Sequence, residues 1–181
     1  MMKPITSLML SVAIGLTSAP MAAAKCVDAF MTGLNNYKAG AHRNQGEFRI
    51  NEMLVICFTP RDSGQIAIFD SPADGAYEQL YPNAWTHPKG DTYIEVTANQ
   101  QQCLGLEDTF PMYHPPDEGT GTGKISFAFT RSAGNQLSEG DFVQLGVVAR
   151  STMESHLRSF PEAGGACGDR EVVYLHYKVV Q

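Results

Sequence analysis

The sequence lacks long hydrophobic runs, blocks of like charge and the short motifs that mark most catalytic sites. No apolar run reaches the roughly 20 residues that a membrane-spanning helix needs, so we expect no membrane span. Charged residues make up only 18% of the chain, and its formal net charge is −6. A mildly acidic chain with scattered charges does not suit a nucleic-acid partner, because phosphate backbones are bound by basic patches.

Motifs for metal, phosphate and nucleophile chemistry are incomplete or absent. The sequence has no C-x-x-C, H-x-H or H-E-x-x-H pattern, and its five histidines are dispersed, so we expect no metal site. Glycines precede Lys124 as in a phosphate loop, but Ile125 stands where such a loop needs Ser or Thr. The G-x-S-x-G elbow of serine hydrolases is missing as well. We therefore predict no catalytic residue and no cofactor.

The N-terminus has the three parts of a secretory signal peptide. Lys3 supplies a positive start, Ile5–Leu16 is apolar, and Ala22–Ala24 forms a small-residue cleavage pattern. We predict cleavage after Ala24 and export to the periplasm or the outside, which removes Lys3 and changes the net charge to −7. A lipoprotein is the alternative, since Cys26 lies just beyond the cleavage point. Lys25 argues against it, because lipid attachment requires a small residue before the cysteine.

Four cysteines follow the signal segment, and an even number in an oxidising compartment predicts two disulfides. Of the three possible pairings we favour Cys57–Cys103, both in strand-like segments, with Cys26–Cys167 tying the two ends of the domain. Closure of the Cys57–Cys103 loop stabilises the fold by about 4 kcal/mol in the chain-entropy model. The cysteines are too widely spaced for a zinc site.

Short strand patterns separated by turns predict that residues 25–181 form one all-β sandwich of about seven or eight strands with one or two small helices. Met53–Phe58, Ile66–Phe69 and Tyr77–Tyr81, with their turns, indicate a β-meander. We expect no regular structure in Phe110–Pro116 and a flexible tip at residues 117–123. Further strands are predicted at Glu47–Ile50, Thr92–Thr97, Lys124–Arg131, Phe142–Val148 (or a helix there) and Glu171–Val180, and helices at Asp28–Ala39 and Thr152–Phe160.

Several of these motifs follow one another in an ordered run within residues 46–132. The run includes Met53–Phe58, the Asp74-Gly75 turn, Leu80-Tyr81-Pro82-Asn83 and Pro115-Pro116 before Gly123-Lys124-Ile125. In this order the chain resembles the bacterial domain-of-unknown-function family numbered four-three-eight-four, often fused to caspase-like peptidase or protein-kinase modules. The resemblance implies an accessory β-sandwich domain and brings no catalytic residues. The chain departs from the family pattern at Asn51-Glu52, in the longer glycine-rich segment Glu118–Gly123 and in its cysteines.

Four aromatic residues form the one binding patch that we predict: Tyr77, Tyr81, Tyr113 and Trp85, the only tryptophan. At the end of a sandwich such rings stack on sugars or anchor peptides, and the alternative is that they fill the core.

We therefore predict a non-enzymatic binding or accessory domain of the bacterial envelope, with a protein partner or an envelope polymer as its ligand. Two alternatives stay open. One is a cell-wall or glycan hydrolase, whose acids, such as Glu107-Asp108 and Asp117-Glu118, would flank a glycosidic bond. The other is an inhibitor or immunity protein for an exported toxin.

Overall fold

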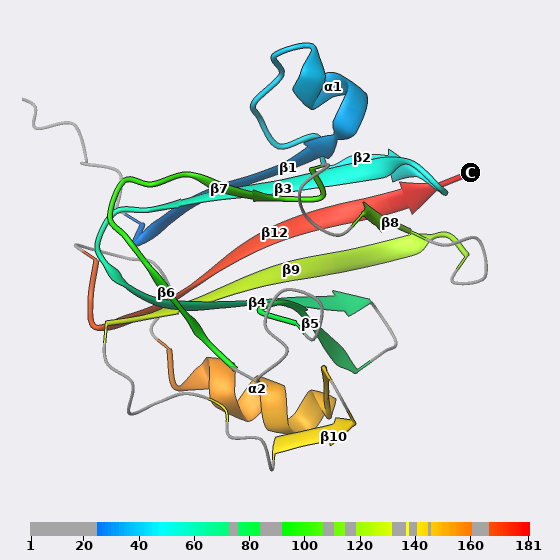
Figure 1. Ribbon diagram of the computed structural model, residues 1–181. Helices are drawn as coiled ribbons and strands as arrows, with labels where there is room; N and C mark the ends of the chain where they lie inside the picture. Colours follow the sequence, from blue (N-terminus) through cyan, green and yellow to red (C-terminus); the bar gives the residue numbers. More distant parts are fainter. Residues whose placement is uncertain are drawn as a thin grey trace, which may run out of the picture.

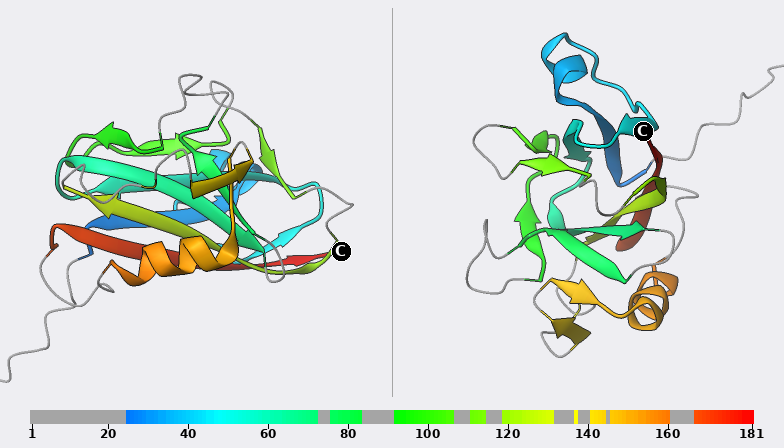
Figure 2. Two further views of the ribbon diagram at one scale, coloured as in Figure 1. Left: turned by 90° about the horizontal axis from the view of Figure 1, so that it is seen from below. Right: turned by 90° about the vertical axis from the view of Figure 1, so that its right-hand side faces the viewer.

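Two β-sheets packed face to face form the body of the protein (Figure 1). The computed structural model describes residues 25–72, 76–83, 92–106, 111–114, 119–131, 137, 141–144, 146–160 and 167–181. Helix α1 lies over the outer side of one sheet and helix α2 over the outer side of the other, so the two helices lie on opposite sides of the sandwich (Figure 2). The all-β sandwich predicted from the sequence is confirmed, but the described residues contain twelve strands where about seven or eight were predicted.

The two sheets differ in size. The first contains β1 (Val27–Gly33), β3 (Met53–Pro60) and β7 (Gln102–Leu104) in that order, with β8 (Met112–Tyr113) also paired to β3. The second runs in the order β10 (Phe142–Gln144), β11 (Val147–Val148), β5 (Tyr77–Tyr81), β4 (Gly64–Pro72), β9 (Gly121–Thr130), β12 (Arg170–Val180) and β2 (Glu47–Arg49), with β6 (Ile94–Val96) also paired to β4. Every pair is antiparallel except β12–β2. The helices are α1 (Leu34–Lys38) and α2 (Arg150–Arg158).

The second sheet is buried on both of its faces. The predicted alternation in β9 is confirmed, since Ile125, Phe127 and Phe129 pack in the core between the sheets. The four β12 residues predicted to face the core join them there: Val173, Leu175, Tyr177 and Val179. On the opposite face of β9, Ala128 packs in a second cluster that includes Met153 of α2. Helix α2 therefore acts as the cover of the outer face.

Both predicted disulfides are present, in the pairing that the sequence favoured. Cys57 and Cys103 are directly opposite each other on β3 and β7. The Cys26–Cys167 bond ties the start of β1 to the segment before β12. Two disulfides fit a protein of an oxidising compartment. Neither helix of the described part has the length and apolar character needed to cross a membrane.

Strands β3 and β4 do not form the predicted hairpin. Residues 61–63 carry the chain from the first sheet to the second, so β3 and β4 lie in different layers. Both edges of β3 are occupied, one by β1 and the other by β7 and β8, which leaves no free edge for β4. The prediction of a three-stranded meander is wrong at this turn, while the β4–β5 hairpin is confirmed.

The predicted helix at Asp28–Ala39 is wrong over its first half. Residues 27–33 form β1, which pairs with β3 along seven residues, and only the short α1 follows. The helical spacing of Phe30, Leu34 and Tyr37 was therefore outweighed by long-range strand pairing.

Two segments expected to be irregular also contain strands. Met112–Tyr113 forms β8, and Gly121–Gly123 belongs to β9, where Gly123 pairs with Tyr177. The ambiguous segment Phe142–Val148 contains strands β10 and β11. The other predicted strands and the helix α2 are confirmed.

Candidate functional site

The structure does not gather the predicted aromatic residues into one patch. Tyr77 is buried against the α2 side of the second sheet, and Tyr81 packs between the sheets, with its ring centroid 6.2 Å from that of Phe58. Residues four apart on a regular strand share a face, so Tyr77 and Tyr81 point to opposite faces only because β5 contains a β-bulge. Ile68 pairs with Tyr81 while Phe69 pairs with Gln79, which leaves one extra residue on β5. Trp85 lies outside the described residues.

Tyr113 lies elsewhere, on β8 at the edge of the first sheet. It is 51% exposed and pairs across the strands with Met53, which is 36% exposed. These two side chains form a small apolar pair, and neither Tyr77 nor Tyr81 belongs to the same face. Tyr77 and Tyr81 therefore contribute to the core, the alternative that the sequence left open, and Tyr113 is the exposed member.

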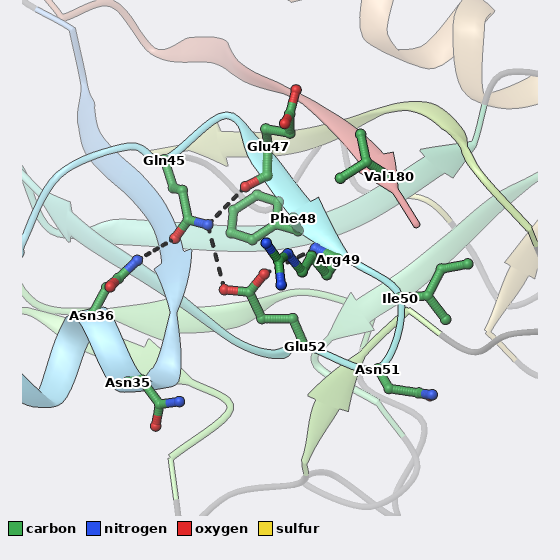
Figure 3. A pocket seen from close by; sticks show the side chains of 10 residues that line it. All are labelled: Asn35, Asn36, Gln45, Glu47, Phe48, Arg49, Ile50, Asn51, Glu52 and Val180. Carbon is green, nitrogen blue, oxygen red and sulfur yellow. Dashed lines mark hydrogen bonds between the residues drawn. The ribbon is translucent and has the colours of Figure 1, made fainter.

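A polar hollow of about 580 Å³ lies between α1 and β2 (Figure 3). Gln45 is its centre: its Oε1 accepts hydrogen bonds from the Gly33 amide and from Asn36 Nδ2, both at 2.8 Å. Its Nε2 donates to the carbonyl oxygen of Glu47 at 2.7 Å. Glu52 Oε2 accepts the amide of Arg49 at 2.9 Å. These polar groups form hydrogen bonds with one another. Through Gln45 they tie the segment after α1 to that helix and to the start of β2.

A second hollow lies between α2 and the outer face of the second sheet, and we call it the α2 cleft. Its volume is about 400 Å³. It is lined by residues of β5, β9, β12, α2 and the end of that helix: Tyr77, Lys124, Arg150, Glu154, Leu157, Arg158, Phe160, Val172 and Tyr174.

Strand and helix periodicity bring these side chains together. Lys124 and Ala128 lie on the same face of β9, as do Val172 and Tyr174 on β12, because alternate residues of a strand share a face. On α2 the lining positions 150, 154, 157 and 158 recur at helical spacing, which puts them on one side of the helix. Buried Leu157 anchors that side to the sheet.

Lys124 extends across the aromatic floor of the α2 cleft. Its Nζ lies 4.6 Å from the ring centroid of Tyr174 and 5.6 Å from that of Tyr77. Both distances are within the range of cation–π attraction, which holds the ammonium group over the rings. Tyr77 therefore reaches the cleft as part of its floor and not as an exposed ring.

The charge of the α2 cleft is positive, in a chain whose net charge is negative. Three basic side chains line it against one carboxylate, that of Glu154. The nearest contact of Arg150 with Glu154 is long, 3.9 Å, and both side chains are more than a third exposed. Arg158 Nε donates to the backbone oxygen of Glu154 at 3.2 Å. Among the described lining residues, three basic side chains therefore stand against one carboxylate, an excess of positive charge that favours anions.

The other side of α2 carries a histidine–tyrosine pair. Tyr93 Oη lies 2.8 Å from His156 Nε2, and the His156 ring packs edge-on against Phe160. Burial lowers the pKa of His156, although Asp141 opposes this, and burial raises the pKa of Tyr93. Both shifts favour the neutral forms, so this part-buried pair links α2 to the segment before β6 without a net charge. The described residues contain no group of three metal-ligating side chains.

Sequence reasoning missed the three basic residues of the α2 cleft. Lys124 had been noticed only as part of an incomplete phosphate loop, and the alternation in β9 could have placed it on the face away from the main core. Arg150 and Arg158 lie at helical spacing on α2, but nothing in the sequence indicates that this helix packs over β9 and β12.

We compared the chain with family models, curated proteins and solved structures, and none of them matches it. The resemblance to the family numbered four-three-eight-four therefore stays a prediction.

Proposed function

We propose that the protein is an exported, non-enzymatic binding domain of the bacterial cell envelope that engages a protein partner or an envelope polymer through the α2 cleft. The observation that carries this proposal is the cleft itself, with three cations around an aromatic floor. What it offers is positive charge and aromatic surface, the groups that proteins use to hold and orient a ligand.

Export is the second part of the proposal. The two disulfides fit an oxidising compartment, and we propose that the signal peptide is removed after Ala24. Cys26, two residues later, is tied to Cys167 and donates its amide to Glu171 Oε1 at 2.9 Å. The second residue after the proposed cleavage point is therefore already held in the fold. N-terminal sequencing of the exported protein should start at Lys25, and retention of residues 1–24 in the exported form would contradict this.

The binding proposal is tested by capture from an envelope extract. Immobilised mature protein is compared with Lys124→Gln and with the control Lys178→Gln, which removes the same charge from an exposed ion pair with Glu47. We expect an envelope component that is retained by the wild type and by Lys178→Gln and lost from Lys124→Gln. Equal retention by all three proteins, or retention by none, would contradict the proposed function.

A further inference from the structure

Among the described residues, Lys124 and Arg158 lack the carboxylate partner that several other basic side chains have. Arg61 pairs with Asp28 at 3.1 Å, Arg131 with Asp62 at 2.6 Å and Lys178 with Glu47 at 3.8 Å. In the described part of the chain, neither Lys124 nor Arg158 has a carboxylate within ion-pair distance. Among the described residues that line it, the α2 cleft therefore has three basic side chains and one carboxylate, an excess of positive charge.

The basic side chains that line the α2 cleft favour an anionic group in the ligand. Lys124 Nζ lies over the rings of Tyr174 and Tyr77, and cation–π attraction favours this position in the free protein. Arg150 and Arg158 line the same cleft, and a guanidinium group binds the oxygen pair of a carboxylate or phosphate through two parallel hydrogen bonds. A carboxylate or phosphate is thus the ligand group that matches this set of donors.

Glu154 adds a second requirement. Its carboxylate lines the same cleft, only accepts hydrogen bonds and has a long 3.9 Å contact with Arg150, so a ligand with donors beside its anionic group would complement it. Sugar hydroxyls are such donors, since each carries an O–H group beside its acceptor oxygen. The volume of about 400 Å³ lies within the usual range of small-ligand pockets.

We infer that the α2 cleft binds an acidic sugar unit, one that carries a carboxylate or a phosphate beside hydroxyl groups. This inference rests on the proposed function, because it names the ligand of the same cleft and selects an envelope polymer over a protein partner. Lys124, Arg150 and Arg158 hold the anionic group, and Glu154 accepts hydrogen bonds from the neighbouring hydroxyls.

The test is an NMR titration of the ¹⁵N-labelled mature protein with glucuronate and with glucose 6-phosphate. Neutral glucose and sodium chloride at matched ionic strength serve as controls. We expect saturable shifts of backbone amides in α2 and around Lys124 and Tyr174 with at least one of the two acids, and none with glucose or salt. The acid that binds more tightly distinguishes a carboxylate from a phosphate ligand.

Variants separate the cleft from general electrostatics. Lys124→Gln should weaken binding of the acid about tenfold or more, because a charge-assisted hydrogen bond is lost, while Lys178→Gln should bind like the wild type. An unchanged spectrum away from the cleft shows that the Lys124→Gln variant is folded.

Two outcomes overturn the inference. One is the absence of saturable shifts with both acids, and the other is tighter binding of a polyglutamate peptide than of either acid. If capture from the envelope extract still depends on Lys124, the ligand class is wrong and the proposed function stands. If capture does not depend on Lys124, the proposed function itself fails.

Discussion

Removal of the two disulfides one at a time gives a quantitative test of the fold. The Cys57–Cys103 bond spans 46 residues and the Cys26–Cys167 bond spans 141. In the chain-entropy model these loops correspond to about 4 and about 5 kcal/mol of stabilisation. The shorter loop lies inside the longer one, so with Cys57–Cys103 intact the longer loop shrinks by 46 residues to about 95, which lowers its contribution to about 4.7 kcal/mol.

The perturbation is a pair of double variants, Cys26→Ala/Cys167→Ala and Cys57→Ala/Cys103→Ala. In each pair one cysteine is fully buried and its partner is partly exposed, so the packing loss is similar in the two variants. The difference between them therefore reports loop length. We expect the Cys26–Cys167 variant to lose slightly more stability than the Cys57–Cys103 variant. Without both bonds the chain should be largely unfolded, because the summed loss approaches the whole stability of a typical domain.

The assay is urea unfolding followed by circular dichroism, with the slope of the transition checked for each variant. Reduction of the wild type under native conditions should reproduce the loss of both bonds without any substitution. A Cys26–Cys167 variant as stable as the wild type would refute the reasoning, because it would show that this bond does not constrain the unfolded chain.

Three further predictions concern single residues. Burial raises the pKa of Glu171 above its ordinary 4.5, so the folded protein keeps this proton to higher pH than the unfolded chain does, and stability falls as pH rises through that window. The Glu171→Gln side chain can still accept the Cys26 amide, so urea unfolding of this variant should not show the fall in stability. If the stability of the variant and of the wild type changed with pH in the same way, Glu171 would not be the group responsible. Gly105→Ala should lower the unfolding free energy by about 2 kcal/mol more than Gly40→Ala does. Both glycines have positive φ, but only at Gly105 would a Cβ overlap the Leu54 carbonyl. Equal losses in the two variants would contradict this. Ser126→Ala should raise the unfolding free energy by about 1 kcal/mol, because Ser126 Oγ is the one buried side-chain polar atom without a hydrogen-bond partner among the described residues; a loss would show that the hydroxyl contributes to stability.

Local patterns predicted most individual strands, and the reason lies in burial. In β9 and β12 every second residue faces the core between the sheets, so alternation in the sequence translates directly into a strand. The disulfide Cys57–Cys103 was predicted for a related reason, since both cysteines lie in strand-like segments that turned out to be neighbours.

Pairing between distant segments is what the sequence did not show. The turn after β3 has the chemistry of a hairpin, yet β1 and β7 occupy the two edges of β3. The apolar spacing at residues 30, 34 and 37 fits a helix, and seven residues of pairing with β3 outweigh it. The α2 cleft was missed for the same reason. It forms only because α2 packs over β9, which precedes it in the chain, and β12, which follows it.

The central claim is that the α2 cleft is the binding site, and amide hydrogen exchange on the mature protein bound to its captured envelope component tests it most directly. We predict slower exchange than in the free protein in α2 (Arg150–Arg158) and in the cleft-lining part of β12, at residues 172–174. Exchange in the polar hollow around Gln45 and at Tyr113 should stay unchanged. Protection confined to that hollow or to the Tyr113 edge, with α2 unaffected, would contradict the account.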